Sequence, residues 1–146
     1  MRTLWISLLS LALAACGAGI TQVPYTAQPQ RIKDPTTELK NLILANTVQG
    51  CIAEPDFSDS MMVVKFACTG NGTGLGNMVV RFARVQTVTV EKSGEWYRVL
   101  VHHTPGTEDF AWSSKSLEDV ERMADAITAL TRPNPGGAPA PSSSPM

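Results

Sequence analysis

The sequence of 146 residues has little of several features that would indicate a function at once. Its formal net charge is only −1, which gives no strong electrostatic reason to bind nucleic acid. It contains two histidines and three cysteines, and no cysteine lies at short ligand spacing from another cysteine or a histidine, which disfavours a metal site. Its main apolar run, residues 4–15, is shorter than the ~20 residues that a membrane-spanning helix needs.

The sequence starts with the order of features found in a secretory signal, MRTLWISLLSLALAAC. Arg2 precedes the apolar run, and two small residues precede Cys16. The tetrapeptide Leu13-Ala14-Ala15-Cys16 resembles the bacterial lipobox. In that family the chain is cut before the cysteine, which then carries acyl chains such as palmitate.

This resemblance implies a lipoprotein signal peptide at residues 1–15 and a membrane partner bound through acyl chains on Cys16. Two or three such chains hold a protein stably at a membrane without a spanning helix. In a cell with two membranes, Gly17 in place of an aspartate favours the outer membrane. The alternatives are a simple signal peptide with an incidental cysteine and an uncleaved anchor helix.

The two remaining cysteines, Cys51 and Cys68, form an even pair in a chain that is expected to be exported. An oxidising compartment favours a disulfide between them. Two buried free thiols are the alternative.

The chain divides by composition into three parts after the signal peptide. Residues 16–33 are polar and interrupted by glycine and proline, which predicts a lipidated tether. Residues 132–146 hold five of the ten prolines and are predicted to be a disordered tail. The folded domain is therefore expected at residues 34–131.

Local signals inside this domain predict two helices around a group of strands. Asp34 and Pro35 suit the start of a helix that Gly50 would end, and Ser116 suits the start of a second helix that Pro133 would end. Apolar and β-branched residues between them predict strands at residues 61–68, 78–82, 85–91, 96–103 and 109–114. This order is typical of an α+β domain with an N-terminal helix and a C-terminal amphipathic capping helix.

The segments VVRFARVQTVTVEKSGEWYRVLVHH and FAWSSKSLEDVERMADAITAL resemble the later strands and C-terminal helix of the pleckstrin-homology-like superfold. The resemblance implies a bent antiparallel sheet of about five or more strands, plugged by the final helix. Members that hold inositol phosphates use basic residues around the first hairpin loop. The corresponding loop here contains no Lys or Arg, so no binding residue is carried over from the family.

The glycine-rich stretch between two predicted strands, ACTGNGTGLGNMVV, invites comparison with phosphate-binding loops. Its glycines do not match G-x-G-x-x-G, and no Lys-Ser or Lys-Thr follows as in a P-loop. A strand rather than a helix N-terminus comes next. The stretch is therefore predicted to connect strands and not to bind a nucleotide.

The residues that could support catalysis or metal binding are few. His102 and His103 are adjacent on a predicted strand, so their side chains should point to opposite faces, and either one could meet Glu108 or Asp109 across a hairpin. Ser113 and Ser114 match no recognisable catalytic spacing. Four aromatic residues form a cluster that is either part of the core or a contact surface: Trp96, Tyr97, Phe110 and Trp112.

Together these features predict a lipid-anchored, non-catalytic envelope protein with a small binding domain that needs no cofactor and no nucleotide. Its partner would be a protein or another envelope component. The alternative is a small periplasm-facing enzyme or metal-dependent protein that uses His102 or His103 with Glu108 or Asp109.

Overall fold

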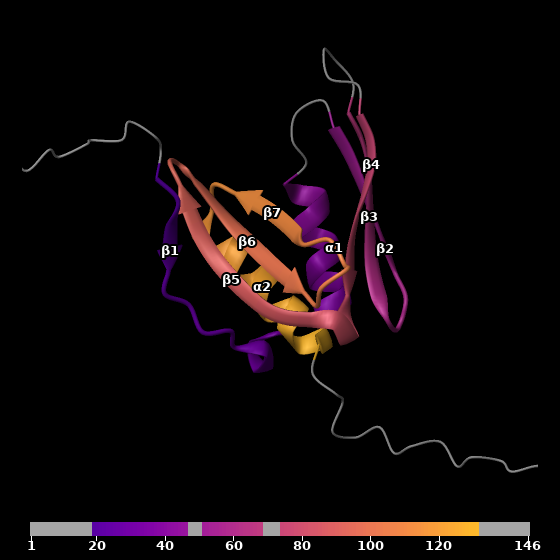
Figure 1. The fold of residues 1–146 in the computed structure, drawn as a ribbon, viewed down its shortest axis with the longest axis horizontal. Coiled ribbons are helices and arrows are strands. Elements are labelled where there is room, and N and C mark those ends of the chain that lie inside the picture. Colours follow the sequence, from indigo (N-terminus) through magenta and orange to yellow (C-terminus); the bar gives the residue numbers. More distant parts are fainter. Residues whose placement is uncertain (1–18, 47–50, 69–73, 132–146) are drawn as a thin grey trace, which may run out of the picture.

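The computed structural model describes residues 19–46, 51–68 and 74–131 (Figure 1). The expected signal peptide, Cys16 and the expected tail lie outside these residues. The elements follow one another as β1 (Thr21–Val23), η1 (Pro29–Arg31), α1 (Pro35–Ala45), β2 (Cys51–Phe57), β3 (Met61–Cys68), β4 (Gly74–Arg81), η2 (Phe82–Arg84), β5 (Val85–Ser93), β6 (Trp96–His103), β7 (Phe110–Ser114) and α2 (Leu117–Thr131).

The strands form two antiparallel sheets, which confirms the general α+β class. One sheet has four strands in the order β1-β5-β6-β7, and the other has three in the order β2-β3-β4. The chain passes from the second sheet to the first through η2. Figure 1 shows the two sheets side by side, with α1 between them and α2 behind the four-stranded sheet.

The alternation of side chains explains how the four-stranded sheet forms. In β6, Val99 and Val101 are buried on one face, while Arg98 and His102 point to the other. The turn from β5 to β6 contains Gly94, whose φ of +60° is a conformation that glycine adopts without the steric cost of a side chain.

Helix α2 packs against this sheet, and α1 packs against α2 and against β2 of the three-stranded sheet. Their start signals are as predicted from the sequence: the Asp34 carboxylate accepts a hydrogen bond from the Thr37 N–H at 3.0 Å, and the Ser116 hydroxyl accepts one from the Asp119 N–H at 3.2 Å. Helix α1 ends at Ala45. The buried face of the two helices consists of Leu39, Leu42, Ile43, Val120, Met123, Ala124, Ala126 and Ile127.

The prediction of a tether over residues 16–33 is wrong from Thr21 onward. Strand β1 pairs with β5, with Thr21 opposite Lys92 and Val23 opposite Val90, so a strand and η1 precede α1. Val23, Tyr25 and Ile32 also pack against the core. A strand of three residues is too short to give a periodic signal in the sequence.

A buried carboxylate holds this N-terminal segment in place. Asp125, which is fully buried in α2, accepts hydrogen bonds from the Tyr25 hydroxyl and, at 2.6 Å, from the Gln28 N–H. Arg31 lies 4.0 Å from the other carboxylate oxygen. Burial and the neighbouring carboxylate raise the pKa of Tyr25, so its hydroxyl keeps the proton that it donates. We call these contacts the N-terminal clamp.

Candidate functional site

An apolar cavity lies between α1 and the three-stranded sheet. Its volume is about 200 Å³. We call it the disulfide pocket, because Cys51 and Cys68 form part of its wall. The remaining lining residues are Ile43, Asn46, Ala53, Val64, Phe66, Met78 and Trp112.

Five elements contribute to this pocket. The inner face of β2-β3-β4 supplies one wall, α1 and its C-cap supply Ile43 and Asn46, and β7 supplies Trp112. Cys51 and Cys68 are directly opposite in the β2-β3 register and form the predicted disulfide. The disulfide therefore ties the two strands together at one end of the pocket.

The polar side chain of the pocket already has partners within the protein. The Asn46 side-chain N–H donates to the Leu42 carbonyl at 3.1 Å, and its carbonyl accepts from the Ser114 hydroxyl at 3.1 Å. An occupant would therefore meet mainly carbon and sulfur atoms. This chemistry suits an apolar group rather than a charged or strongly hydrogen-bonding one.

The facing strands β4 and β7 are edge strands of their sheets. Met78 of β4 and Trp112 of β7 both line the disulfide pocket. A second cavity of about 240 Å³ lies between residues 77–81 and residues 106–109, the loop that precedes β7. Met78 of β4 thus lines both cavities.

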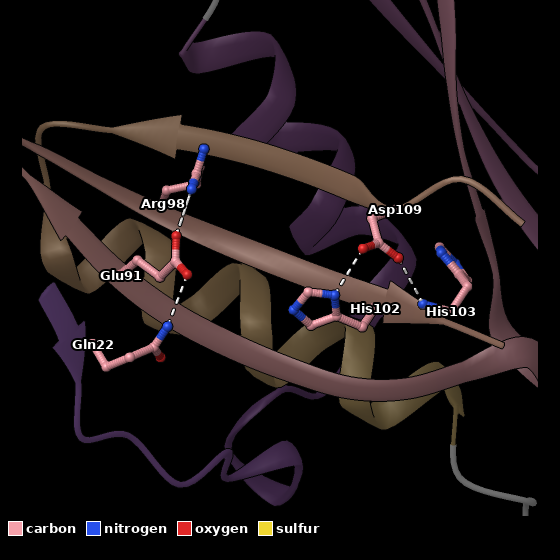
Figure 2. A network of polar contacts seen from close by, with 6 residues as sticks. All are labelled: Gln22, Glu91, Arg98, His102, His103 and Asp109. Atoms are coloured by element: carbon pink, nitrogen blue, oxygen red, sulfur yellow. Dashed lines mark hydrogen bonds and ion pairs between the residues drawn. The ribbon is translucent and has the colours of Figure 1, made fainter. Parts of the chain in front are cut away.

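The two histidines point to opposite faces of the four-stranded sheet, as the sequence predicts (Figure 2). His102 is 42% exposed, and its Nδ1 lies 2.7 Å from a carboxylate oxygen of Asp109. His103 is buried, and its Nε2 accepts from the Arg81 N–H at 3.3 Å. Its Nδ1 is buried and has no hydrogen-bond partner among the described residues.

Asp109 contacts both histidines in different ways. It accepts from the His103 backbone N–H at 3.0 Å as well as from the His102 ring. These two hydrogen bonds, the backbone one first, lower the pKa of Asp109. Asp109 lines the cavity beside β4 together with Glu108, but neither histidine does. The described residues contain no group of three or more His, Cys, Asp or Glu that could hold a metal.

The fold divides the four aromatic residues of the predicted cluster between the core and the surface. Phe110 and Trp112 are buried in the core, and Tyr97 is half-buried. Trp96, at the start of β6, is 45% exposed. The group is therefore core at one end and surface at the other.

The glycine-rich stretch lies partly outside the described residues, which exclude 69–73. The part that is described explains one glycine: Gly76 of β4 is opposite Phe66 of β3. A Cβ at residue 76 would lie 2.2 Å from the Phe66 ring, which is too close for any side chain. Gly76 is thus required for packing of the ring that lines the disulfide pocket.

Two buried carboxylates were not found by sequence reasoning. Asp125 holds the N-terminal clamp. Glu91 of β5 accepts from Gln22 of β1 at 2.8 Å and pairs with Arg98 of β6 at 2.5 Å, so it links three strands (Figure 2). The partners of Asp125 and the Gln22 partner of Glu91 are distant in sequence and leave no local signal, whereas Arg98 lies across the β5-β6 hairpin from Glu91.

Comparison with protein-family models, with curated proteins and with solved structures gives no match. Within the part of the chain that is described, neither helix has the length and apolar composition to cross a membrane. The function is therefore inferred from the chemistry of this chain's own residues.

The lowered pKa of Asp109 predicts a pH-dependent contribution to stability. Because the carboxylate is favoured in the folded state, its contribution is present above the ordinary value of 3.8 and is lost as the pH falls through the lower folded value. Asp109→Asn should reduce the free energy of unfolding near pH 7 and have a much smaller effect near pH 2. Urea unfolding at the two pH values measures this difference.

Glu108→Gln is the matched control, since it removes the neighbouring exposed charge from the same loop. It should change stability little at either pH. An equal loss for Asp109→Asn at both pH values would contradict the assigned role of the carboxylate.

Proposed function

We propose that this protein is a lipid-anchored, non-catalytic envelope protein whose domain binds an apolar group of a partner protein in the disulfide pocket. The lipobox resemblance of residues 13–16 supports the anchor at Cys16 and, with Gly17, the outer membrane. The disulfide Cys51–Cys68 supports an oxidising compartment, because such bonds are rare in a reducing cytoplasm.

The size and lining of the pocket support the proposed occupant. An apolar cavity of ~150 Å³ accepts a molecule the size of benzene, and typical small-molecule sites begin at ~300 Å³. A pocket of about 200 Å³ therefore suits one apolar side chain or a short alkyl group. The neighbouring free edge of β4 could pair with the backbone of an extended partner segment, which would carry such a side chain.

The order of β5, β6, β7 and α2 supports the pleckstrin-homology-like architecture as part of this proposal. In that architecture the final helix closes a bent sheet, and α2 lies against the four-stranded sheet here. The fold itself assigns no ligand.

One observation favours the enzymatic alternative, namely the exposed pair of His102 and Asp109. With Nδ1 hydrogen-bonded to the carboxylate, the His102 Nε2 is an available proton acceptor. The pair also has a structural role, since Asp109 joins the strand end at His103 to the following loop. The non-catalytic function is favoured because the histidines diverge and neither lines the cavity beside Asp109.

The anchor is tested by expressing the full precursor in a Gram-negative bacterium and determining the mass of the purified protein. The mature chain should begin at Cys16 and exceed the polypeptide mass by two or three acyl groups. Cys16→Ser should abolish both processing and the added mass. Gly17→Asp should move the acylated protein from outer to inner membrane fractions, and a protein that retains Met1 without acyl groups would contradict the proposal.

The pocket is tested with bromohexanol, a short apolar alcohol whose bromine quenches tryptophan in contact with it. Because Trp112 lines the pocket, quenching should saturate in a Trp96→Phe background. Ala53→Phe, which fills the pocket, should weaken this binding at least tenfold. If the phenylalanine ring impairs folding, Ala53→Leu fills less of the pocket and serves as the second variant.

Ala111→Phe is the control, because Ala111 is a half-buried strand alanine that does not line the pocket. It should leave the saturable quenching unchanged. Quenching that rises linearly with bromohexanol, or that Ala53→Phe and Ala53→Leu leave intact, would contradict the proposed binding site.

A further inference from the structure

The start of β1 fixes how far the folded domain can lie from Cys16. Four residues separate Cys16 from Thr21, so five Cα steps of at most ~3.6 Å give a reach of about 18 Å. Thr21 lies opposite Lys92, near the turn that joins β5 to β6. In Figure 1 the described chain begins beside this hairpin end. A membrane anchor at Cys16 would therefore hold this end of the molecule close to the bilayer.

The same end exposes apolar side chains. Among the residues whose burial is described, the exposed large apolar side chains are Ile20, Leu44 and Trp96. Ile20, which directly precedes β1, is 61% exposed, and Trp96, the first residue of β6, is 45% exposed. Ile20 and Trp96 thus lie at the end of the domain that is nearest to Cys16 along the chain.

Trp96 and Tyr97 are adjacent in β6 and point to opposite faces of the sheet, so each face of the hairpin end carries one lysine beside an aromatic ring. The Lys115 ammonium lies 5.3 Å from the centre of the Trp96 ring, and the Lys92 ammonium lies 5.4 Å from that of Tyr97. Glu95 pairs with Lys115 at 3.7 Å, which leaves this group of charges net positive. Trp and Tyr favour the boundary between lipid headgroups and acyl chains, and lysines are attracted to anionic headgroups.

We propose that the β5-β6 hairpin end, defined by Ile20, Lys92, Trp96, Tyr97 and Lys115, rests on the phospholipid surface to which Cys16 is anchored. This inference rests on the proposed lipid anchor. A bilayer is the proposed partner of this surface, because the short connection to Cys16 keeps the β5-β6 hairpin end near the membrane. This contact attaches the domain to the membrane in addition to the acyl chains, and it fixes the orientation of the domain.

The disulfide pocket is separate from the β5-β6 hairpin end, because none of its lining residues belongs to that surface. Strand β1 is one edge of the four-stranded sheet and β7 is the other. The disulfide pocket lies at the β7 side, with Trp112 in its lining. The pocket therefore lies at the opposite edge of the four-stranded sheet from β1.

The test uses the chain from Cys16 to its C-terminus, with the disulfide Cys51–Cys68 intact so that Cys16 is the single free thiol. Cys16 is coupled to a maleimide lipid in vesicles of phosphatidylethanolamine and phosphatidylglycerol, with or without brominated acyl chains. Brominated lipid should quench at least half of the emission that Trp96 contributes, measured as the difference between the unsubstituted chain and Trp96→Phe. Trp96→Phe should abolish the lipid-dependent quenching because Trp112 is buried. Replacing both Lys92 and Lys115 by Gln should weaken it on anionic vesicles.

Chemical coupling separates this test from the test of acylation in cells. A protein that is not acylated by the bacterium overturns the anchor, whereas a coupled protein without lipid quenching overturns the surface contact alone. Quenching that persists in Trp96→Phe also overturns it. A blue shift of Trp96 that follows protein concentration rather than lipid would instead assign this surface to a second copy of the chain.

Discussion

A buried carboxylate in α2 holds the segment between β1 and α1 against the rest of the domain. Asp125 gathers the Tyr25 hydroxyl, the Gln28 N–H and the Arg31 guanidinium around one side chain. A buried carboxylate without such partners would be strongly unfavourable, so the N-terminal segment and α2 stabilise each other. The clamp also brings β1 to the edge of the four-stranded sheet, where Gln22 reaches Glu91. Segments about one hundred residues apart therefore form one unit.

This constraint links the fold to the proposed function. Because the fold includes β1, four residues separate Cys16 from its first strand, in place of the tether expected over residues 16–33. A short connection restricts the orientations of the domain at a membrane. It would place the β5-β6 hairpin end on the lipid and leave the disulfide pocket, on the other side of the sheet, for the apolar group of a partner.

Local chemistry made much of the fold predictable from sequence. Helix starts at Asp34 and Ser116 follow from side-chain caps, and β3, β5, β6, β7 and the second half of β4 follow from period-two apolar patterns. The prediction was wrong for residues 74–77, which belong to β4 and not to a connecting loop. Strand β2 was missed because Pro55 and its acidic neighbours resemble a turn, although an edge strand tolerates them. The disulfide pocket and the clamp combine residues from distant segments, and no local pattern reports such contacts. The glycine-rich stretch is visible in the sequence, but the need for glycine at residue 76 comes from the Phe66 ring on the neighbouring strand.

Amide hydrogen exchange at Gln28 tests the central claim most directly, because this N–H donates to Asp125 and lies in the segment whose sequence suggests a tether. The account predicts exchange at least about a hundredfold slower than in an unstructured chain, as expected for a backbone proton that requires opening of the fold. It also predicts that the Gln28 amide is protected whenever the amide of Ile127, on the buried helix face, is protected. Exchange of Gln28 at the unstructured rate, while Ile127 stays protected, would show that the N-terminal segment is free of α2 and would contradict the account.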